Sequence, residues 1–123
     1  MSAPSTNRMY RRISTNYIGY CLTSHSFQPA IVQDISLNGF RIEGPSNLAL
    51  NSVVTLQLWL PDGEGMIDIE QAVVRWRRER EFGMQVVLLS NAADFRLARH
   101  VEQRLRQSAR HDAVQSRWKR MAG

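Results

Sequence analysis

Several residue types are scarce in this chain of 123 residues, and each scarcity narrows what the protein can be. The single cysteine, Cys21, excludes an internal disulfide and is weak support for a metal site or a nucleophile. His25, His100 and His111 are scattered, and their spacing matches no zinc site. No apolar run is long enough to span a bilayer, and no apolar signal-peptide segment follows the polar N-terminus. We therefore predict a cytoplasmic protein that does not insert into a membrane.

The chain also lacks an arrangement of side chains typical of an active site. We expect Cys21 to be a buried small apolar residue on a strand, and we expect the histidines to be solvated. Three carboxylates near one predicted turn, Glu64, Asp68 and Glu70, are interpreted as solvated edge charges. The segment 63–65 is no phosphate loop, because no Lys or Ser/Thr follows at the required position. The sequence predicts a protein that is not an enzyme and needs no metal or cofactor.

Lysine is nearly absent: fifteen of the sixteen basic residues are arginine, and Lys119 is the exception. Arginine is better suited than lysine to bidentate contacts with phosphate and guanine and to stacking. The positive charge lies at the two ends of the chain. Residues 1–12 carry a net charge of +3 and residues 91–123 carry +5, whereas residues 13–90 hold five arginines against eight acidic residues. The middle of the chain is therefore mildly acidic.

Alternating apolar and polar side chains, separated by short turn sequences, predict six strands. The expected strands cover residues 15–23, 28–36, 40–43, 53–60, 66–76 and 82–88. In the fifth strand the apolar residues change parity, which indicates a β-bulge near Glu70 and Gln71. Six short strands without interleaved helices imply an all-β antiparallel barrel or sandwich.

One long helix is predicted after the last strand. Ser90 or Asn91 would cap its N-terminus, and Asp94 in the first turn favours the helix dipole. Apolar residues at helical spacing indicate the face expected to pack on the barrel: Phe95, Ala98, Val101, Leu105 and Ala109. The more polar second half is expected to protrude for self-association or to fray. The chain thus divides into a flexible arm over 1–12, a barrel over 13–90 and a helix over 91–123.

Two short motifs stand out, one before the first predicted strand and one at the end of the second. Arg8 and Arg12 are four residues apart and could clamp one anionic ligand together. Asp34 and Ser36 would share one strand face, before a tight turn at Asn38–Gly39 whose residues tolerate positive φ. Arginine can donate hydrogen bonds to phosphate and to one edge of guanine, and a carboxylate can accept hydrogen bonds from the donor groups on the opposite edge. Together the motifs are complementary to a guanine nucleotide. Taken alone, the first motif also fits a solvated arginine cluster, and the second also fits a hairpin with a capped turn.

The two motifs in this order, 22 residues apart, resemble the PilZ domain family, receptors for the bacterial messenger cyclic di-GMP. The family pattern is RxxxR, then a strand, then [D/N]xSxxG. This chain has Arg8-x-x-x-Arg12 and Asp34-x-Ser36-x-x-Gly39 without substitution, and the resemblance covers about residues 8–89. Asn7 departs from the pattern, because many relatives carry a further basic residue there. That departure leaves open whether one cyclic di-GMP or an intercalated pair binds.

The resemblance implies a six-stranded β-barrel, followed by the long helix, with cyclic di-GMP on the outer surface of the barrel. Arg8 and Arg12 would contact phosphates and guanine, while Asp34 and Ser36 would read a guanine edge. Gly39 would permit the turn and a close approach. The other residues of the implied ligand-binding set are Arg11, Asn38 and Arg75, with Trp59 or Trp76 at the border.

We therefore predict a non-enzymatic cyclic di-GMP receptor whose arm is ordered by the ligand and whose new surface signals to an effector protein. Motility, surface polysaccharide and biofilm control are outputs that the family implies. Two alternatives stay open. One is a small barrel that binds single-stranded nucleic acid, which the acidic middle disfavours. The other is a PilZ-like adaptor that binds protein and no nucleotide.

Overall fold

Six antiparallel strands and one C-terminal helix make up the structure, a computed structural model that describes residues 11–44 and 47–122, with side chains as far as residue 109. The strands are β1 Ile13–Leu22, β2 Phe27–Ile35, β3 Gly39–Glu43, β4 Val53–Leu60, β5 Gly65–Arg78 and β6 Glu81–Leu88. The helix, α2, covers Asn91–Ala122. The predicted strands and helix are confirmed, with differences of one or two residues at their ends.

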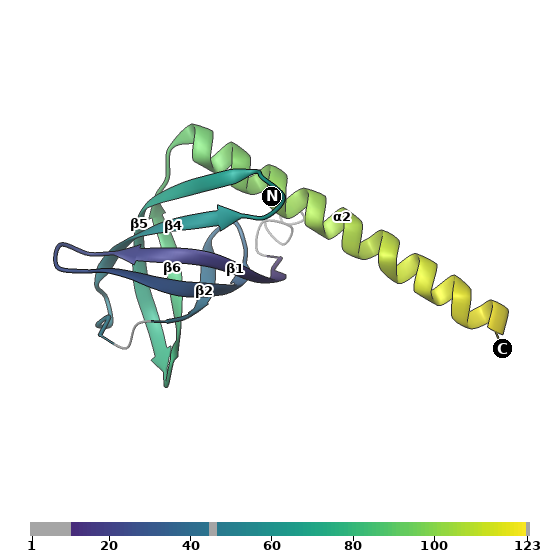
Figure 1. The fold of residues 1–123 in the computed structure, drawn as a ribbon, viewed down its shortest axis with the longest axis horizontal. Coiled ribbons are helices and arrows are strands. Elements are labelled where there is room, and N and C mark those ends of the chain that lie inside the picture. The colour runs from purple at the N-terminus through teal and green to yellow at the C-terminus, as the bar shows by residue number, and fades with distance from the viewer. Residues whose placement is uncertain (1–10, 45–46, 123) are drawn as a thin grey trace, which may run out of the picture.

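The sheet closes on itself in the order β1-β2-β3-β6-β5-β4, and β4 returns to pair with β1. Every neighbouring pair of strands is antiparallel, so the predicted six-stranded antiparallel barrel is confirmed. In Figure 1 the helix crosses one end of the barrel and then continues well beyond it. Within the described residues, no helix combines the length and the apolar character needed to cross a membrane.

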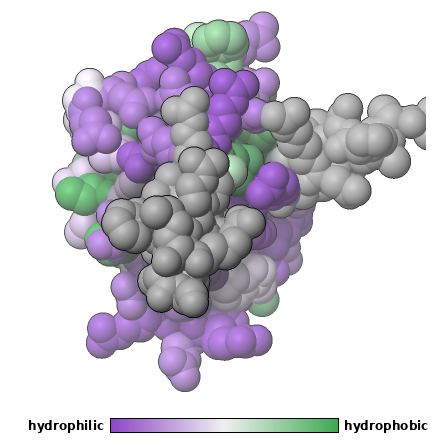
Figure 2. All heavy atoms as spheres, turned by 90° about the vertical axis from the view of Figure 1, so that its right-hand side faces the viewer, coloured by the Kyte–Doolittle hydropathy of each residue, from purple (hydrophilic) through white to green (hydrophobic). Residues whose placement is uncertain are grey.

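The barrel interior is filled by the apolar side chains that alternate along each strand. On β4 the side chains of Val54, Leu56 and Leu58 are fully buried. Cys21 is also buried, as expected, and burial raises the pKa of its thiol to about 12. The surface around the protruding helix is mainly hydrophilic in Figure 2. The apolar core therefore lies inside the closed sheet.

The predicted bulge in β5 is confirmed by the strand register. Leu56 pairs with Ile69 and Val54 pairs with Ala72, so Thr55 lies opposite the two residues Glu70 and Gln71. The extra residue changes the parity of the inward side chains along β5. Because of this change, residues on both sides of the bulge in this 14-residue strand contribute to one core, namely Ile67, Ile69, Ala72 and Val74.

The helix packs on the barrel as predicted, with a face that includes the predicted Val101 and Leu105 but not the predicted Phe95. Ser90 caps it, since its Oγ accepts a hydrogen bond from the Ala93 N–H at 3.1 Å. The buried apolar residues are Ala93, Leu97 and Val101, with Leu105 partly buried, whereas 67% of Phe95 is exposed. Phe95 precedes Leu97 by two residues, about 200° around the helix, so both cannot face the barrel. The expectation that Phe95 packs on the barrel is wrong.

His100 corrects a second expectation, because it is buried rather than solvated. Its Nε2 lies 2.8 Å from the Tyr17 hydroxyl of β1, and its Nδ1 lies 3.4 Å from Oε1 of Glu64 in the β4–β5 turn. His100 completes the same helix face as Leu97 and Val101. Its ring therefore ties the helix to the barrel through polar contacts as well as packing.

Candidate functional site

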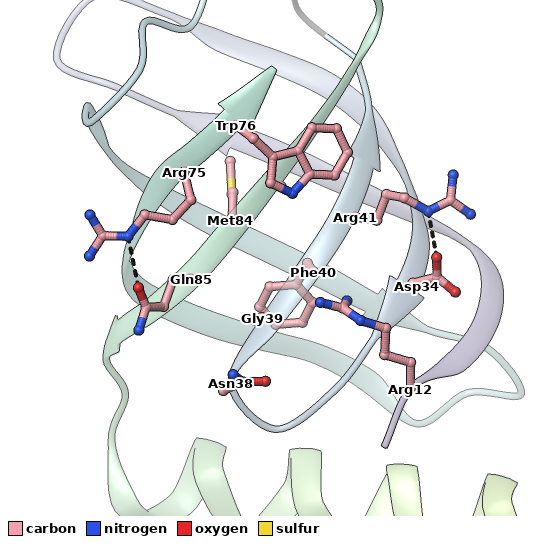
Figure 3. A pocket seen from close by; sticks show the side chains of 11 residues that line it. Arg12, Asp34, Asn38, Gly39, Phe40, Arg41, Arg75, Trp76, Met84 and Gln85 are labelled. Atoms are coloured by element: carbon pink, nitrogen blue, oxygen red, sulfur yellow. Dashed lines mark hydrogen bonds and ion pairs between the residues drawn. The ribbon is translucent and has the colours of Figure 1, made fainter. Parts of the chain in front are cut away.

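A pocket of about 380 Å³ lies on the outside of the barrel, over strands β3, β6 and β5 (Figure 3). Five of the residues predicted for the ligand site line it. Arg12, Asp34 and Arg75 carry charge, and Asn38 and Gly39 lie at one end. The other lining residues are Phe40, Arg41, Trp76, Gly83, Met84 and Gln85. Charged groups from four segments thus meet around one hollow.

A β-bulge in β2 turns Asp34 toward this pocket. Val32 pairs with Ile42 and Asp34 pairs with Arg41, so one residue of β2, Gln33, is extra. Val32 and Ile35 are both fully buried, although they differ in parity. Without the extra residue Asp34 would share the inward face with Val32. The bulge instead leaves the carboxylate partly exposed beside the pocket.

Arg41 holds the Asp34 carboxylate, and Arg41 was not among the site residues predicted from the sequence. Its Nε donates to Oδ2 of Asp34 at 2.5 Å. Its Nη1 donates to Oε1 of Gln33 at 2.9 Å and to Oε1 of Glu81 at 3.2 Å. The hydrogen bond to Asp34 is the main reason why the pKa of Arg41 is raised. The signal in the sequence was the hairpin itself, which puts Arg41 directly across from Asp34.

Ser36 stabilises the β2–β3 turn and does not line the pocket. It follows the end of β2 and is 1% exposed, so Asp34 and Ser36 do not share a strand face as predicted. Its Oγ donates to Oδ1 of Asn38 at 2.7 Å and lies 3.2 Å from the Gly39 carbonyl oxygen. The Asn38 carbonyl accepts from the Val86 N–H at 2.9 Å. The motif serine therefore fixes the turn that borders the site.

Gly39 is required for close packing rather than for a special backbone angle. Among the described residues, positive φ occurs at Asn51, Asp62, Glu79, Gly63 and Gly65, so the 38–39 turn does not use the positive φ that its residues tolerate. A Cβ on Gly39 would lie 2.5 Å from the Met84 carbonyl oxygen of β6. The close approach that the motif glycine allows is thus between two strands.

Trp76 and Arg75 form the β5 side of the pocket. The Trp76 indole covers Gly83, where any Cβ would overlap the ring, and 40% of the tryptophan remains exposed. Arg75 donates from its Nε to Oε1 of Gln85 on β6 at 2.7 Å. Of the two tryptophans predicted as candidates for the border of the site, Trp76 lines this pocket and Trp59 does not.

The N-terminal motif is only partly described. Arg12 precedes β1 and lines the pocket, and Figure 3 shows its side chain extending toward the Gly39–Phe40 segment. Arg11 lines a neighbouring hollow against the helix. Arg8 lies outside the described residues, as does most of the segment 1–12 that was predicted to be a flexible arm. Among the described side chains, no three His, Cys, Asp or Glu residues are arranged as a metal site.

Comparison with known protein families assigns the chain to one family. The PilZ domain model matches residues 6–103, which is most of the chain and includes both motifs. The chain therefore belongs to the PilZ domain family. PilZ domains are typically receptors for cyclic di-GMP and are not catalytic. A search of curated proteins finds no match.

Two solved structures match the chain at low sequence identity. The Bacillus subtilis inhibitor of motility (MotI/DgrA) matches with a TM-score of 0.67 and 16% identity, over 81% of this chain and 51% of that protein. The chain thus spans about half the length of the motility inhibitor. An uncharacterised Legionella protein, Lpg0364, matches with a TM-score of 0.49 and 15% identity, over 82% of this chain and 99% of the other. The first match supports the barrel fold.

Proposed function

We propose that this PilZ domain binds cyclic di-GMP in the pocket lined by Arg12, Asp34 and Arg75. The observation that carries the proposal is the meeting of these three side chains, from the start of β1, the bulge of β2 and β5, around one hollow. Among the described residues that line the pocket, the charged ones are three arginines and one aspartate, a net charge of +2. Cyclic di-GMP carries two phosphodiester charges, so the pocket and the ligand are complementary in charge.

Each group has a distinct role in the proposed complex. Arg12, with Arg8 from the preceding segment, binds phosphate or the O6/N7 edge of a guanine. Asp34 accepts hydrogen bonds from the donor groups on the other guanine edge, while Arg41 keeps its carboxylate oriented. The exposed Trp76 indole offers a stacking surface for a base. Ser36, Asn38 and Gly39 act mainly by shaping the turn.

Signalling by this domain would follow from the surface that the ligand creates. The ligand would draw the segment containing Arg8 and Arg12 against the barrel, and an effector protein would recognise the result. The fold likeness to an inhibitor of motility makes motility one output worth testing, beside polysaccharide and biofilm control. In this proposal the chain acts in the cytoplasm, where the messenger is made.

Isothermal titration of the purified chain with cyclic di-GMP tests the proposal. We expect binding by the wild-type protein and a loss of about 10- to 100-fold in affinity for Arg12→Ala and for Asp34→Ala, since hydrogen bonds to charged groups contribute about 1.5–3 kcal/mol. GMP and cyclic di-AMP should bind far more weakly. The matched control is Arg78→Ala, because Arg78 is an exposed arginine of β5 that does not line the pocket. Wild-type affinity in both site variants would contradict the proposal.

A further inference from the structure

A second hollow, of about 500 Å³, lies between the start of β1 and the helix α2. Three arginines line it: Arg11 and Arg12 from the N-terminal side, and Arg104 from the helix. Ser14, Gln107 and Ser108 add hydroxyl and amide donors to the same walls. None of the lining residues that the structure describes is acidic. The chemistry of this hollow is therefore that of an anion site.

The arginines of this hollow have few partners of their own. Within the described part of the chain, Arg11 and Arg12 make no ion pair. The ion pair of Arg104 is long, because its Nη2 lies 3.6 Å from Oδ2 of Asp62, whose side chain is 80% exposed. Its guanidinium also lies 6.0 Å from the ring centroid of Tyr17. Like charges gathered in this way repel one another, and a bound anion would relieve the repulsion.

Arg12 connects this hollow to the proposed ligand pocket, because it lines both. A cyclic dinucleotide held by Arg12 in the first pocket has a second phosphodiester on the opposite side of its ring. The three arginines and the hydroxyl donors suit a phosphodiester group, since arginine binds phosphate oxygens by charge-assisted hydrogen bonds. One anionic ligand can therefore reach both hollows.

We propose that the hollow between β1 and α2 binds a phosphate group of the cyclic dinucleotide, and that Arg104 is a ligand contact supplied by the helix. This inference rests on the proposed function, and it adds the helix to the site. In this arrangement the ligand contacts α2 directly through Arg104. The bound phosphate would replace the weak contact of Arg104 with Asp62 and so fix the helix against the N-terminal segment.

Titration of Arg104 variants of the full chain with cyclic di-GMP tests this assignment. We expect Arg104→Gln to weaken binding about tenfold, which is the loss of one charge-assisted contact. Arg104→Lys should retain part of the affinity, because it keeps the charge without the planar fork. Arg106→Gln is the matched control, since Arg106 is an exposed arginine of the same helix and pairs with Glu102. Its affinity should equal that of the wild type.

Two outcomes separate this inference from the proposed function. If the wild type binds cyclic di-GMP and Arg104→Gln binds it equally well, the role of Arg104 is wrong and the receptor function stands. If the wild type binds no cyclic di-GMP, the proposed function fails. Thermal unfolding with pyrophosphate at constant ionic strength then tests whether the second hollow binds a phosphate group. A rise in the wild-type Tm that Arg104→Gln loses and Arg106→Gln keeps would support a phosphate site there. No rise in the wild type would overturn it.

Discussion

At the scale of single residues, His100 shows how the fold changes the chemistry of a side chain. Burial lowers its pKa below the ordinary value of 6.5, and the nearby Glu64 opposes this shift only in part. Arg104 also lowers the pKa, while Asp62 raises it, and the Tyr17 hydroxyl contacts Nε2. The neutral imidazole is therefore the form that the folded protein favours.

The stability of the domain should consequently fall in mild acid. Between the lowered pKa and 6.5 the unfolded chain binds a proton at His100 that the folded chain does not, so the free energy of unfolding decreases as the pH drops below about 6.5. Urea unfolding at pH 7.5, 6.5 and 5.5 would measure this. His100→Gln keeps a polar side chain without the titration and should show a flatter pH dependence. Equal pH dependence in both proteins would contradict the assignment.

Residue-scale features of the site were predictable in part. Both motifs were visible in the sequence, and the structure brings Arg12, Asp34 and Arg75 to one pocket. The buried position of Ser36 was not predictable from alternation, because β2 ends before it. The bulge that exposes Asp34 did leave a signal, since two polar residues, Gln33 and Asp34, stand between buried Val32 and Ile35. Strict alternation would assign one of these two polar residues to the inward face, so it cannot predict that both avoid the core.

At the scale of the elements, the contact between α2 and the barrel depends on a narrow apolar face. Leu97 is fully buried and Phe95 is mostly exposed, although Phe95 is the larger residue. The sequence alone could not choose between them, because both positions belong to plausible helical stripes. The strands were easier to locate, since their alternation and turns are independent of the helix.

Two alanine substitutions in the helix should therefore have opposite outcomes. Leu97→Ala should lower the free energy of unfolding by about 2–5 kcal/mol, because it leaves a cavity between α2 and the barrel. Phe95→Ala should change it by less than about 0.5 kcal/mol, as for other surface positions. Chemical denaturation followed by circular dichroism would measure both. A larger loss for Phe95→Ala than for Leu97→Ala would show that the helix packs with its other face.

At the scale of the whole molecule, the closed barrel encloses its single thiol. Cys21 is 1% exposed on β1, which is paired on both sides by β2 and β4. Burial also raises the pKa of the thiol to about 12, so almost no reactive thiolate forms at neutral pH. Reaction of this residue requires opening of the barrel.

Thiol labelling should therefore report the stability of the barrel. In the folded protein at pH 8, we expect Cys21 to react with a disulfide reagent far more slowly than the unfolded chain in urea does. Ligand should slow the labelling further if it binds the folded state, because binding stabilises that state. Rapid labelling of the native protein, at the rate of a free thiol, would show that this part of the barrel opens easily.

The helix α2 extends far beyond its contact with the barrel, so a small change in its angle at that contact would displace its far end. Among the side chains that the structure describes, which extend to residue 109, the last buried one on the helix is Val101 and Leu105 is partly covered, while the helical backbone continues to Ala122 (Figure 1). The part beyond Leu105 is roughly 25 Å long at about 1.5 Å per residue. A tilt of about 10° at Arg104 would swing its far end by about 4 Å at that length. If a phosphate group binds in the second hollow, as proposed, a small change in the angle of the helix there would become a larger movement at its far end, where an effector protein could detect it.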